Sequence, residues 1–312
     1  MDERFQDNRP IDEQIRSSER GVRFAAISAA FALALMLFLG LKPASARAAW
    51  QRFARIIDLK SDPVSASPAI FPEHVHEALA RMKPQEQSEL LLEGAIDHHS
   101  GAIEQLSSHV DGWRGHLNMD PRLSGDLNTA LNSNDLRVRA AGIEVELAAY
   151  NLAKTPRDAQ QLMKRIEKDP PARPWALWML GAMGNRGVEP ERTLKLLDRY
   201  SHDPDEKTRF WAVEGMSLLG SDATLEPMLE VFRHDSSQEV RESAGRGIAQ
   251  SGMLTKEQRM KAVPALLNYA EDPALDSSTR SWVFQALRDI TGESLGSNAS
   301  GWRSWWIENA RR

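Results

Sequence analysis

The sequence has no cysteine among its 312 residues. This absence excludes disulfide bonds, thiolate metal ligands and cysteine nucleophiles. Because a chain without thiols is compatible with an oxidising exterior as well as with a reducing cytosol, the absence leaves the compartment open.

Motifs for covalent catalysis and nucleotide binding are also absent. The chain has no Gly-x-Ser-x-Gly, no phosphate-binding loop and no Gly-x-Gly-x-x-Gly. A net charge of −5 gives no overall attraction for phosphate backbones, so we do not expect nucleic acid as the principal partner. We predict a non-catalytic protein without a cofactor, and we assign no catalytic, cofactor-binding or metal-binding residue.

One long run without charge is present, FAAISAAFALALMLFLGL at residues 24–41. As a helix it would be roughly 27 Å long, just enough to cross the apolar core of a bilayer. We predict a single transmembrane helix that acts as a signal anchor, because the run and the polar tail before it (residues 1–23) are long for a signal peptide. The alternative is a cleaved signal, with its site at Ala44-Ser45-Ala46 or Ala46-Arg47-Ala48.

The orientation of this segment is not decided by the basic residues within 15 residues of it, which are equal in number on both sides. They are Arg9, Arg16, Arg20 and Arg23 before the run, and Lys42, Arg47, Arg52 and Arg55 after it. A long hydrophilic domain after a first apolar segment is usually exported in bacterial-looking chains, so we expect an extracytoplasmic domain. Residues 42–72 are enriched in Pro, Ser and Ala, which predicts a flexible linker.

A sequence repeat begins further along the chain. Three stretches agree closely: DPPARPWALWMLGAMG (169–184), DPDEKTRFWAVEGMSLLG (203–220) and DSSQEVRESAGRGIAQSG (235–252). In each, an arginine is followed by an alanine three residues later and a glycine eleven residues later. These sets are Arg173, Ala176 and Gly184; Arg209, Ala212 and Gly220; and Arg241, Ala244 and Gly252.

Two weaker copies flank these three. In residues 135–150 either Arg137 or Arg139 could be the equivalent arginine, and in residues 276–292 the equivalent is Arg280. An apolar stretch with helical periodicity precedes each copy: 123–133, 158–168, 190–200, 223–233 and 256–270. Strand-like alternation is nearly absent. We therefore predict an all-α solenoid of about five helical hairpins over residues 123–292, because a lone hairpin cannot bury its apolar face.

The second helices, with Asp…(Val/Thr)-Arg-x-x-Ala…Gly, resemble those of the HEAT-repeat family, including the subgroup labelled phycobiliprotein-lyase-like. The resemblance implies a surface that binds other macromolecules, and it does not imply lyase activity. It also implies a ladder of turn aspartates and helix arginines along the stack, with Asp203 and Arg209, and Asp235 and Arg241, in that role. We expect the aspartates to cap or hold the turns, the alanines to allow close helix approach, and Gly220 and Gly252 to end their helices in the left-handed conformation.

Helical caps are predicted at both ends of the stack. Residues 73–122 carry a helical apolar pattern and should cover the first repeat, and residues 293–312 should form a tryptophan-rich capping helix. Trp302, Trp305 and Trp306 would lie on one face of that helix. The alternative for this face is an aromatic platform that binds a glycan or a peptide.

A second alternative is an enzyme that uses the histidine-rich segment at residues 74–116, with Glu93, Asp97, His98 and His99 as its nearest group. No His-Glu-x-x-His or Glu-x-x-His spacing is present, so a metal or acid–base site would have to form between helices. We favour a membrane-anchored scaffold that binds another protein. Its candidate contact residues on the second helices are Glu214, Arg246 and Arg288.

Overall fold

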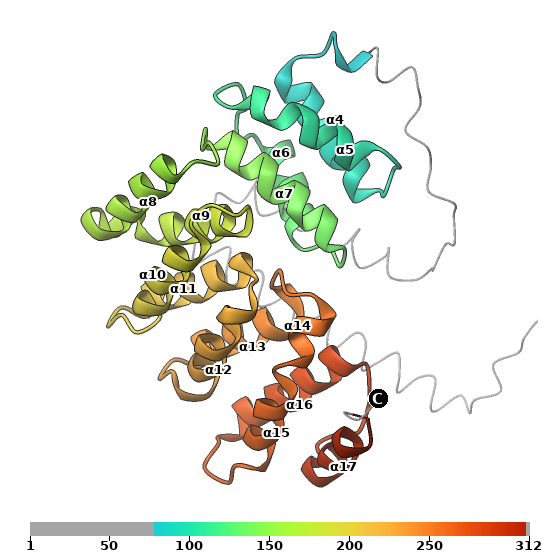
Figure 1. Ribbon diagram of the computed structural model, residues 1–312, viewed down its shortest axis with the longest axis vertical. Coiled ribbons are helices and arrows are strands. Elements are labelled where there is room, and N and C mark those ends of the chain that lie inside the picture. The colour runs from blue at the N-terminus through green and yellow to red at the C-terminus, as the bar shows by residue number, and fades with distance from the viewer. Residues whose placement is uncertain (1–77, 310–312) are drawn as a thin grey trace, which may run out of the picture. The chain divides into compact units, whose positions relative to one another are not determined.

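The computed structural model describes residues 78–309, which fold into helices without a β-strand (Figure 1). The prediction of an all-α solenoid is confirmed for these residues. The polar tail, the predicted transmembrane helix (24–41) and the linker lie outside the described residues. Among the described helices, none is long and apolar enough to cross a membrane.

The first helices of the described chain share one core. They are α4 (Pro84–Ile96), α5 (Ala102–His109), the 3₁₀ helix η2 (Val110–Trp113), α6 (Pro121–Leu131) and α7 (Leu136–Ala149). Leu92, Leu106 and Trp113 are buried there against Val138 and Val145 of α7. The segment before residue 123 therefore packs together with the first hairpin, α6–α7, in a core of its own.

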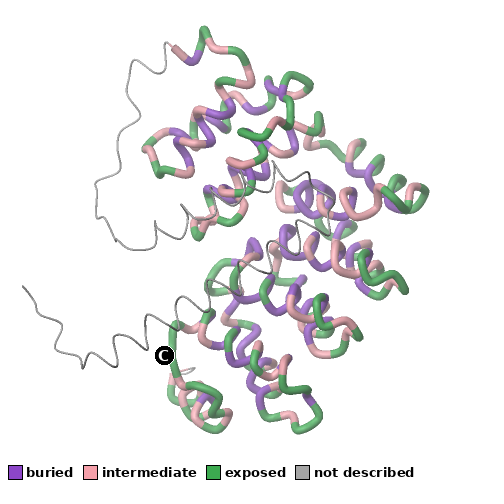
Figure 2. The backbone as a smooth tube through the Cα atoms, turned by 180° about the vertical axis from the view of Figure 1, so that it is seen from behind, coloured by how far each residue is buried: buried purple, intermediate pink, exposed green. Residues whose placement is uncertain are grey.

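The repeats form a second core in two layers (Figure 1). The first helices are α8 (Pro156–Lys168), α10 (Pro190–Tyr200), α12 (Leu225–His234) and α15 (Val263–Glu271), and the second helices are α9 (Arg173–Asn185), α11 (Glu206–Leu219), α13 (Gln238–Arg246) and α16 (Ser277–Thr291). Figure 2 shows how buried residues concentrate in the second helices while the turns are exposed. Because α7 also contributes Ile143 and Leu147 to this core, it joins the two cores.

The fifth hairpin differs from the expected one because its first helix is broken. Residues 256–270 form a short α14 (Lys256–Met260), and α15 begins only at Val263, with Pro264 in its first turn. A proline is tolerated there because the first amides of a helix have no partner within the helix. After α16, α17 (Ala299–Asn309) packs against α15 and buries Trp302 completely.

The second helices α9 and α11 approach each other until their backbones are in contact. Ala176, Ala212 and Ala244 are fully buried, in agreement with the expected close packing. The backbone contact is made by two other residues: a Cβ added at Gly181 would overlap the carbonyl oxygen of Gly215, and one added at Gly215 would lie 2.8 Å from the carbonyl oxygen of Leu177. Only glycine fits at these two positions.

The turn aspartates hold the turns, but other residues cap the helices. Asp203 accepts the amide of Asp205 at 2.9 Å, and Asp205 itself caps α11 by accepting the amide of Thr208 at 2.9 Å. In the next repeat Asp235 accepts the amide of Ser237 at 2.7 Å, and Ser237 caps α13. The cap lies two residues later than the repeated aspartate because that aspartate folds the turn back before the helix begins.

The two glycines that follow α11 and α13 behave differently. Gly220 ends α11 with φ 61°, in the predicted left-handed conformation. The same prediction for Gly252 is wrong: its φ is −74° and its backbone is extended. The reason is that α13 continues into a π-helical turn, η5 (Gly247–Ser251), so the chain leaves this helix by another path.

The arginine–aspartate ladder is present, and its pairs join neighbouring repeats. They are Arg173–Asp203, Arg209–Asp235 and Arg241–Asp276. Arg209 holds Asp235 with two hydrogen bonds, Nε to Oδ2 at 2.7 Å and Nη2 to Oδ1 at 3.0 Å. Its Nη1 donates to the backbone oxygen of Asp203 at 3.0 Å, so the pairing of Asp203 with Arg209 is through the main chain. The four residues expected in the ladder thus belong to it, but each arginine pairs its side chain with the aspartate of the following repeat.

Within residues 78–309, the arginine of the first repeat does not form a ladder pair and instead contacts a distant part of the chain. The guanidinium of Arg139 donates to the backbone oxygen of Ser133, six residues earlier, as that of Arg209 does to Asp203, so Arg139 is the equivalent arginine. Its Nη1 reaches the carbonyl oxygens at residues 250–252, at 2.7–3.1 Å. Arg259 of α14 binds carbonyl oxygens of the same turn, and burial beside Arg139 lowers the pKa of Arg259 to about 10.

Replacing Gly181 with alanine tests the contact between α9 and α11. We expect Gly181→Ala to lower the free energy of unfolding by about 2–3 kcal/mol, because the new methyl group overlaps a backbone oxygen that cannot move independently. Gly112→Ala is the matched control, since an added Cβ there has no atom within 4 Å, and it should change stability by less than about 0.5 kcal/mol. Equal denaturation midpoints for the two variants would show that these backbones are not in contact.

Candidate protein-interaction surface

Three of the second helices carry the same short pattern, an arginine followed two residues later by a tryptophan. These are Arg173-Pro-Trp175, Arg209-Phe-Trp211 and Arg280-Ser-Trp282. A helix advances by about 100° per residue, so positions two and five after the arginine lie on one side and the alanine at position three points away from it. The pattern is visible in the sequence, but the alignment of the repeats on arginine, alanine and glycine does not single it out.

We call the side chains at these two positions the second-helix surface. It comprises Trp175 and Trp178 of α9, Trp211 and Glu214 of α11, Arg246 of α13, and Trp282 and Gln285 of α16, whereas the equivalent Ser243 of α13 is fully buried. The four tryptophans are half-buried, so each packs on the stack and also meets solvent. Side chains of this kind present rigid apolar area at a low cost in conformational entropy.

The part of the surface on α9 and α11 is aromatic. Trp178 and Trp211 meet edge to face, with ring centroids 5.9 Å apart and planes at 85°. Tyr150, at the end of α7, makes a similar contact with Trp175 at 5.3 Å, and the guanidinium of Arg165 lies 4.9 Å from the Trp175 ring. The ring contacts fix the orientation of these side chains.

A carboxyl group lies beneath the aromatic part. The indole Nε1 of Trp178 donates to Oε2 of Glu146 at 3.1 Å, which ties α7 to α9. Burial among apolar side chains raises the pKa of Glu146 to about 7, because the charged form loses its hydration. The pKa of Tyr150 is raised by burial and by the charge of Glu146.

The part of the surface on α11 and α13 is charged, and it contains two of the predicted contact residues. Glu214 accepts hydrogen bonds from Ser243 Oγ at 2.6 Å and Arg246 Nη2 at 3.3 Å, and burial raises the pKa of its carboxyl group. The side chain of Arg246 is 41% exposed. Arg246 thus lies on the surface with Glu214 beneath it as its counter-ion, whereas Arg288 is half-buried elsewhere on α16.

A small cleft continues the surface from α13 to α16. It has a volume of about 70 Å³ and is lined by Arg246, Trp282 and Gln285 among others. At its edge Gln250 Nε2 donates to Asp289 Oδ2 at 2.6 Å. The surface therefore extends over four helices, and the contacts Trp178–Trp211, Arg246–Glu214 and Gln250–Asp289 each join one repeat to the next.

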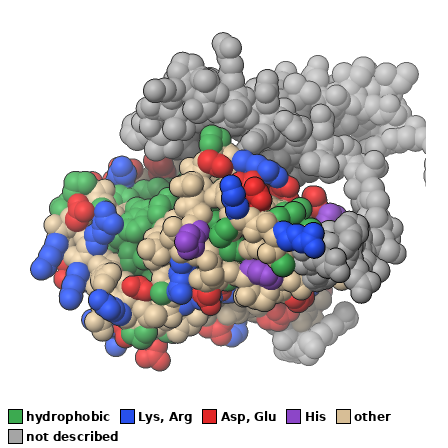
Figure 3. All heavy atoms as spheres, turned by 90° about the horizontal axis from the view of Figure 1, so that it is seen from above, with side chains coloured by type: hydrophobic (Ala, Val, Ile, Leu, Met, Phe, Trp, Pro, Cys, Tyr) green, Lys and Arg blue, Asp and Glu red, His purple; other side chains and the backbone are tan. Residues whose placement is uncertain are grey.

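The histidine-rich segment is not brought together into a site in the part that the structure describes. His98 lies 3.7 Å from Asp135, and His109 Nδ1 lies 2.8 Å from the carbonyl oxygen of Gln105. The histidine side chains visible in Figure 3 are separate and do not touch one another in that view. Within residues 78–309 no group of three or more His, Asp or Glu could hold a metal ion. His74 and His76 lie outside the described residues.

The tryptophans at the C-terminus do not form a three-ring platform. Trp302 is fully buried and donates its Nε1 to the carbonyl oxygen of Gly296 at 2.9 Å. Trp305 and Trp306 are half-buried against the same core. Their burial indicates that α17 covers the last hairpin.

Comparison with known protein families supports the repeat assignment. Residues 159–249 match the family model of HEAT repeats, and this range covers α8 to α13, where the three closest copies lie. The match is to HEAT repeats in general and does not distinguish the phycobiliprotein-lyase-like subgroup. No curated protein matched the sequence.

The carboxyl group of Glu146 should make stability depend on pH. An acid whose pKa is raised in the folded state binds more protons there than in the unfolded chain, so stability falls as pH rises from about 4.5 to 7. Glu146→Gln removes the ionisable group and, with it, this loss of stability at rising pH. We expect the variant to gain about 2–3 kcal/mol relative to the wild type between pH 5 and pH 8, measured by urea denaturation. Parallel stability curves for the two proteins would contradict the assignment.

Proposed function

We propose that this protein is a non-catalytic scaffold that binds another protein through the second-helix surface and is held at a membrane by residues 24–41. The observation that carries the proposal is the half-buried row of tryptophans that continues into the exposed Arg246. Tryptophan and arginine are the residue types that contribute most to binding energy in protein interfaces. HEAT repeats commonly mediate protein–protein interaction, which supports the same conclusion.

The shape of the surface favours a protein over a small molecule as its partner. Pockets for small molecules usually enclose about 300–1,000 Å³, whereas the cleft between α13 and α16 has about 70 Å³. A stable protein interface covers about 800 Å² on each partner. A surface that runs over four second helices supplies contact area of that kind without a deep cavity.

The membrane attachment rests on the sequence of the apolar run. A segment of this length without charge is long enough to span the hydrocarbon core, and residues 42–72 would connect it to the helices. We propose a single-pass protein whose helical domain lies outside the cytoplasm. A scaffold of this type would keep its partner close to the membrane surface.

The proposed binding surface is tested by a charge placed on its rim. Gln285 is exposed at the edge of the cleft, so Gln285→Arg adds bulk and charge there with little effect on folding. We expect cross-linking and affinity capture from native membranes to recover a stoichiometric partner with the wild type, and at least tenfold less of it with Gln285→Arg.

Gln161→Arg is the matched control, because Gln161 is exposed on α8 in the layer of first helices. It should recover the partner as well as the wild type does. Recovery of the same partner by both variants, or its loss from both, would contradict the assignment of the second-helix surface.

The proposed orientation is tested by a single cysteine in the otherwise cysteine-free chain. Ser304 is exposed on α17, so the thiol in Ser304→Cys is accessible to reagents. We expect a membrane-impermeant maleimide to label this variant on intact cells as fully as it does after permeabilisation. Labelling that requires permeabilisation would place the helical domain in the cytoplasm instead.

A further inference from the structure

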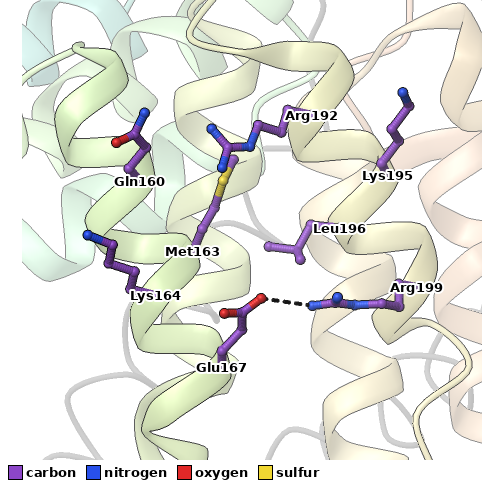
Figure 4. A pocket seen from close by; sticks show the side chains of 8 residues that line it. All are labelled: Gln160, Met163, Lys164, Glu167, Arg192, Lys195, Leu196 and Arg199. Carbon is purple, nitrogen blue, oxygen red and sulfur yellow. Dashed lines mark hydrogen bonds and ion pairs between the residues drawn. The ribbon is translucent and has the colours of Figure 1, made fainter.

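A basic groove lies between the first helices α8 and α10, in the layer opposite the second-helix surface. Both helices pack against α9, and between them is a cavity of about 420 Å³ (Figure 4). Each helix lines it with residues at positions i, i+3, i+4 and i+7, beginning at Gln160 in α8 and at Arg192 in α10. The groove therefore follows both helices for about two turns, or roughly 10 Å.

Positive charge dominates the lining of this groove. Four of its eight residues are cationic, namely Lys164, Arg192, Lys195 and Arg199, and one is acidic, Glu167. Glu167 and Arg199 form an ion pair at 3.4 Å that closes one end of the groove. The excess of cations is notable in a protein whose net charge is −5.

The remaining cations have few partners of their own. Arg192 pairs at 3.0 Å with Glu189, which lies just before its own helix. Neither Lys164 nor Lys195 forms an ion pair with any residue in the range 78–309. The two lysines thus stand on opposite walls of the groove with charges that an outside group can neutralise.

The floor of the groove is apolar. Met163 is buried between the two helices, and Leu196 is half-buried beside it. Figure 4 shows Arg192 reaching across Met163 while the two lysines extend from opposite helices. The cationic groups do not converge on one point, so a compact anion such as phosphate could not contact several of them together.

We infer that this groove is a docking site for an acidic segment of a protein partner, one in which carboxylates alternate with apolar side chains. Carboxylates spaced along an extended chain can meet Lys164, Arg192 and Lys195 in turn, while apolar side chains cover Met163 and Leu196. We assign an acidic peptide as the occupant because its carboxylates complement the cations and its apolar side chains complement the apolar floor. Because the groove lies in the other layer, the scaffold binds at two separate surfaces.

The test uses the full-length chain in detergent and a fluorescein-labelled peptide of eight residues with glutamate and leucine in alternation. We expect saturable binding by fluorescence anisotropy, and at least tenfold weaker binding when glutamine replaces glutamate in the peptide. Raising the salt from about 50 mM to about 500 mM should weaken binding at least fivefold, because exposed charges are screened.

Two double variants locate the binding site. Lys164→Glu with Lys195→Glu should weaken binding at least tenfold, whereas Lys207→Glu with Lys256→Glu makes the same change in net charge at exposed positions outside the groove and should bind as the wild type does. Equal loss in both double variants, or no binding by the wild type, would overturn the proposal.

Vesicles that contain phosphatidylserine distinguish a lipid from a peptide as the occupant. If the Lys164 and Lys195 variant loses vesicle binding but keeps peptide binding, the groove is a membrane contact and the inference is wrong. Because none of these residues belongs to the second-helix surface, Gln285→Arg should bind the peptide normally, and failure of one proposal is distinguishable from failure of the other.

Discussion

The backbone contact between α9 and α11 is the constraint on which the rest of the stack depends. Gly181 and Gly215 leave no space for a side chain between these helices, so their backbones are in direct contact. This contact brings Trp178 against Trp211 and sets Arg173 near Asp203 of the next repeat. Each hairpin cannot bury its apolar face alone, and stacking on the neighbouring hairpin covers that face.

Charged groups have different roles in different layers of the fold. Along the second helices, arginines are held by aspartates of the next repeat or by backbone oxygens, and the side chains of Arg209 and Asp235 are only 12% and 4% exposed. Arg139 and Arg259 donate hydrogen bonds to the carbonyl oxygens of the turn after α13. In the groove between α8 and α10, by contrast, the lysines are open to solvent. The buried charged groups stabilise the fold, whereas the exposed lysines of the groove are available to bind a partner.

The periodic features of the fold could be predicted from the sequence. Arginine, alanine and glycine recur at fixed offsets because each repeat places them in equivalent surroundings, and this was enough to find the hairpins. Whether the repeated aspartates cap the helices or hold the turns could not be decided from the sequence, because Asp203 and Asp205 are both suitable caps and only the path of the turn selects Asp205. The conformation of Gly252 depends on a π-helical turn that leaves no clear mark in the sequence.

Contacts between segments that are distant in the chain could not be predicted from the sequence. The ladder pairs an arginine with the aspartate of the following repeat, and that choice depends on the spacing of hairpins in space. The contact of Arg139 with residues 250–252 spans more than one hundred positions of the chain. The surface tryptophans were detectable, because Trp175, Trp211 and Trp282 occupy one repeat position. The groove required knowing that α8 and α10 lie side by side.

Amide hydrogen exchange of the full-length chain tests the central claim, that the second helices form the continuous element of the stack. The account predicts that amides of α9 and α11 open only together, with one shared opening free energy that is the highest in the protein. Amides of α8 and α10 should open at lower free energy, because these helices are covered on one side only. Independent opening of α9 and α11, or stronger protection of α8 and α10, would contradict the account.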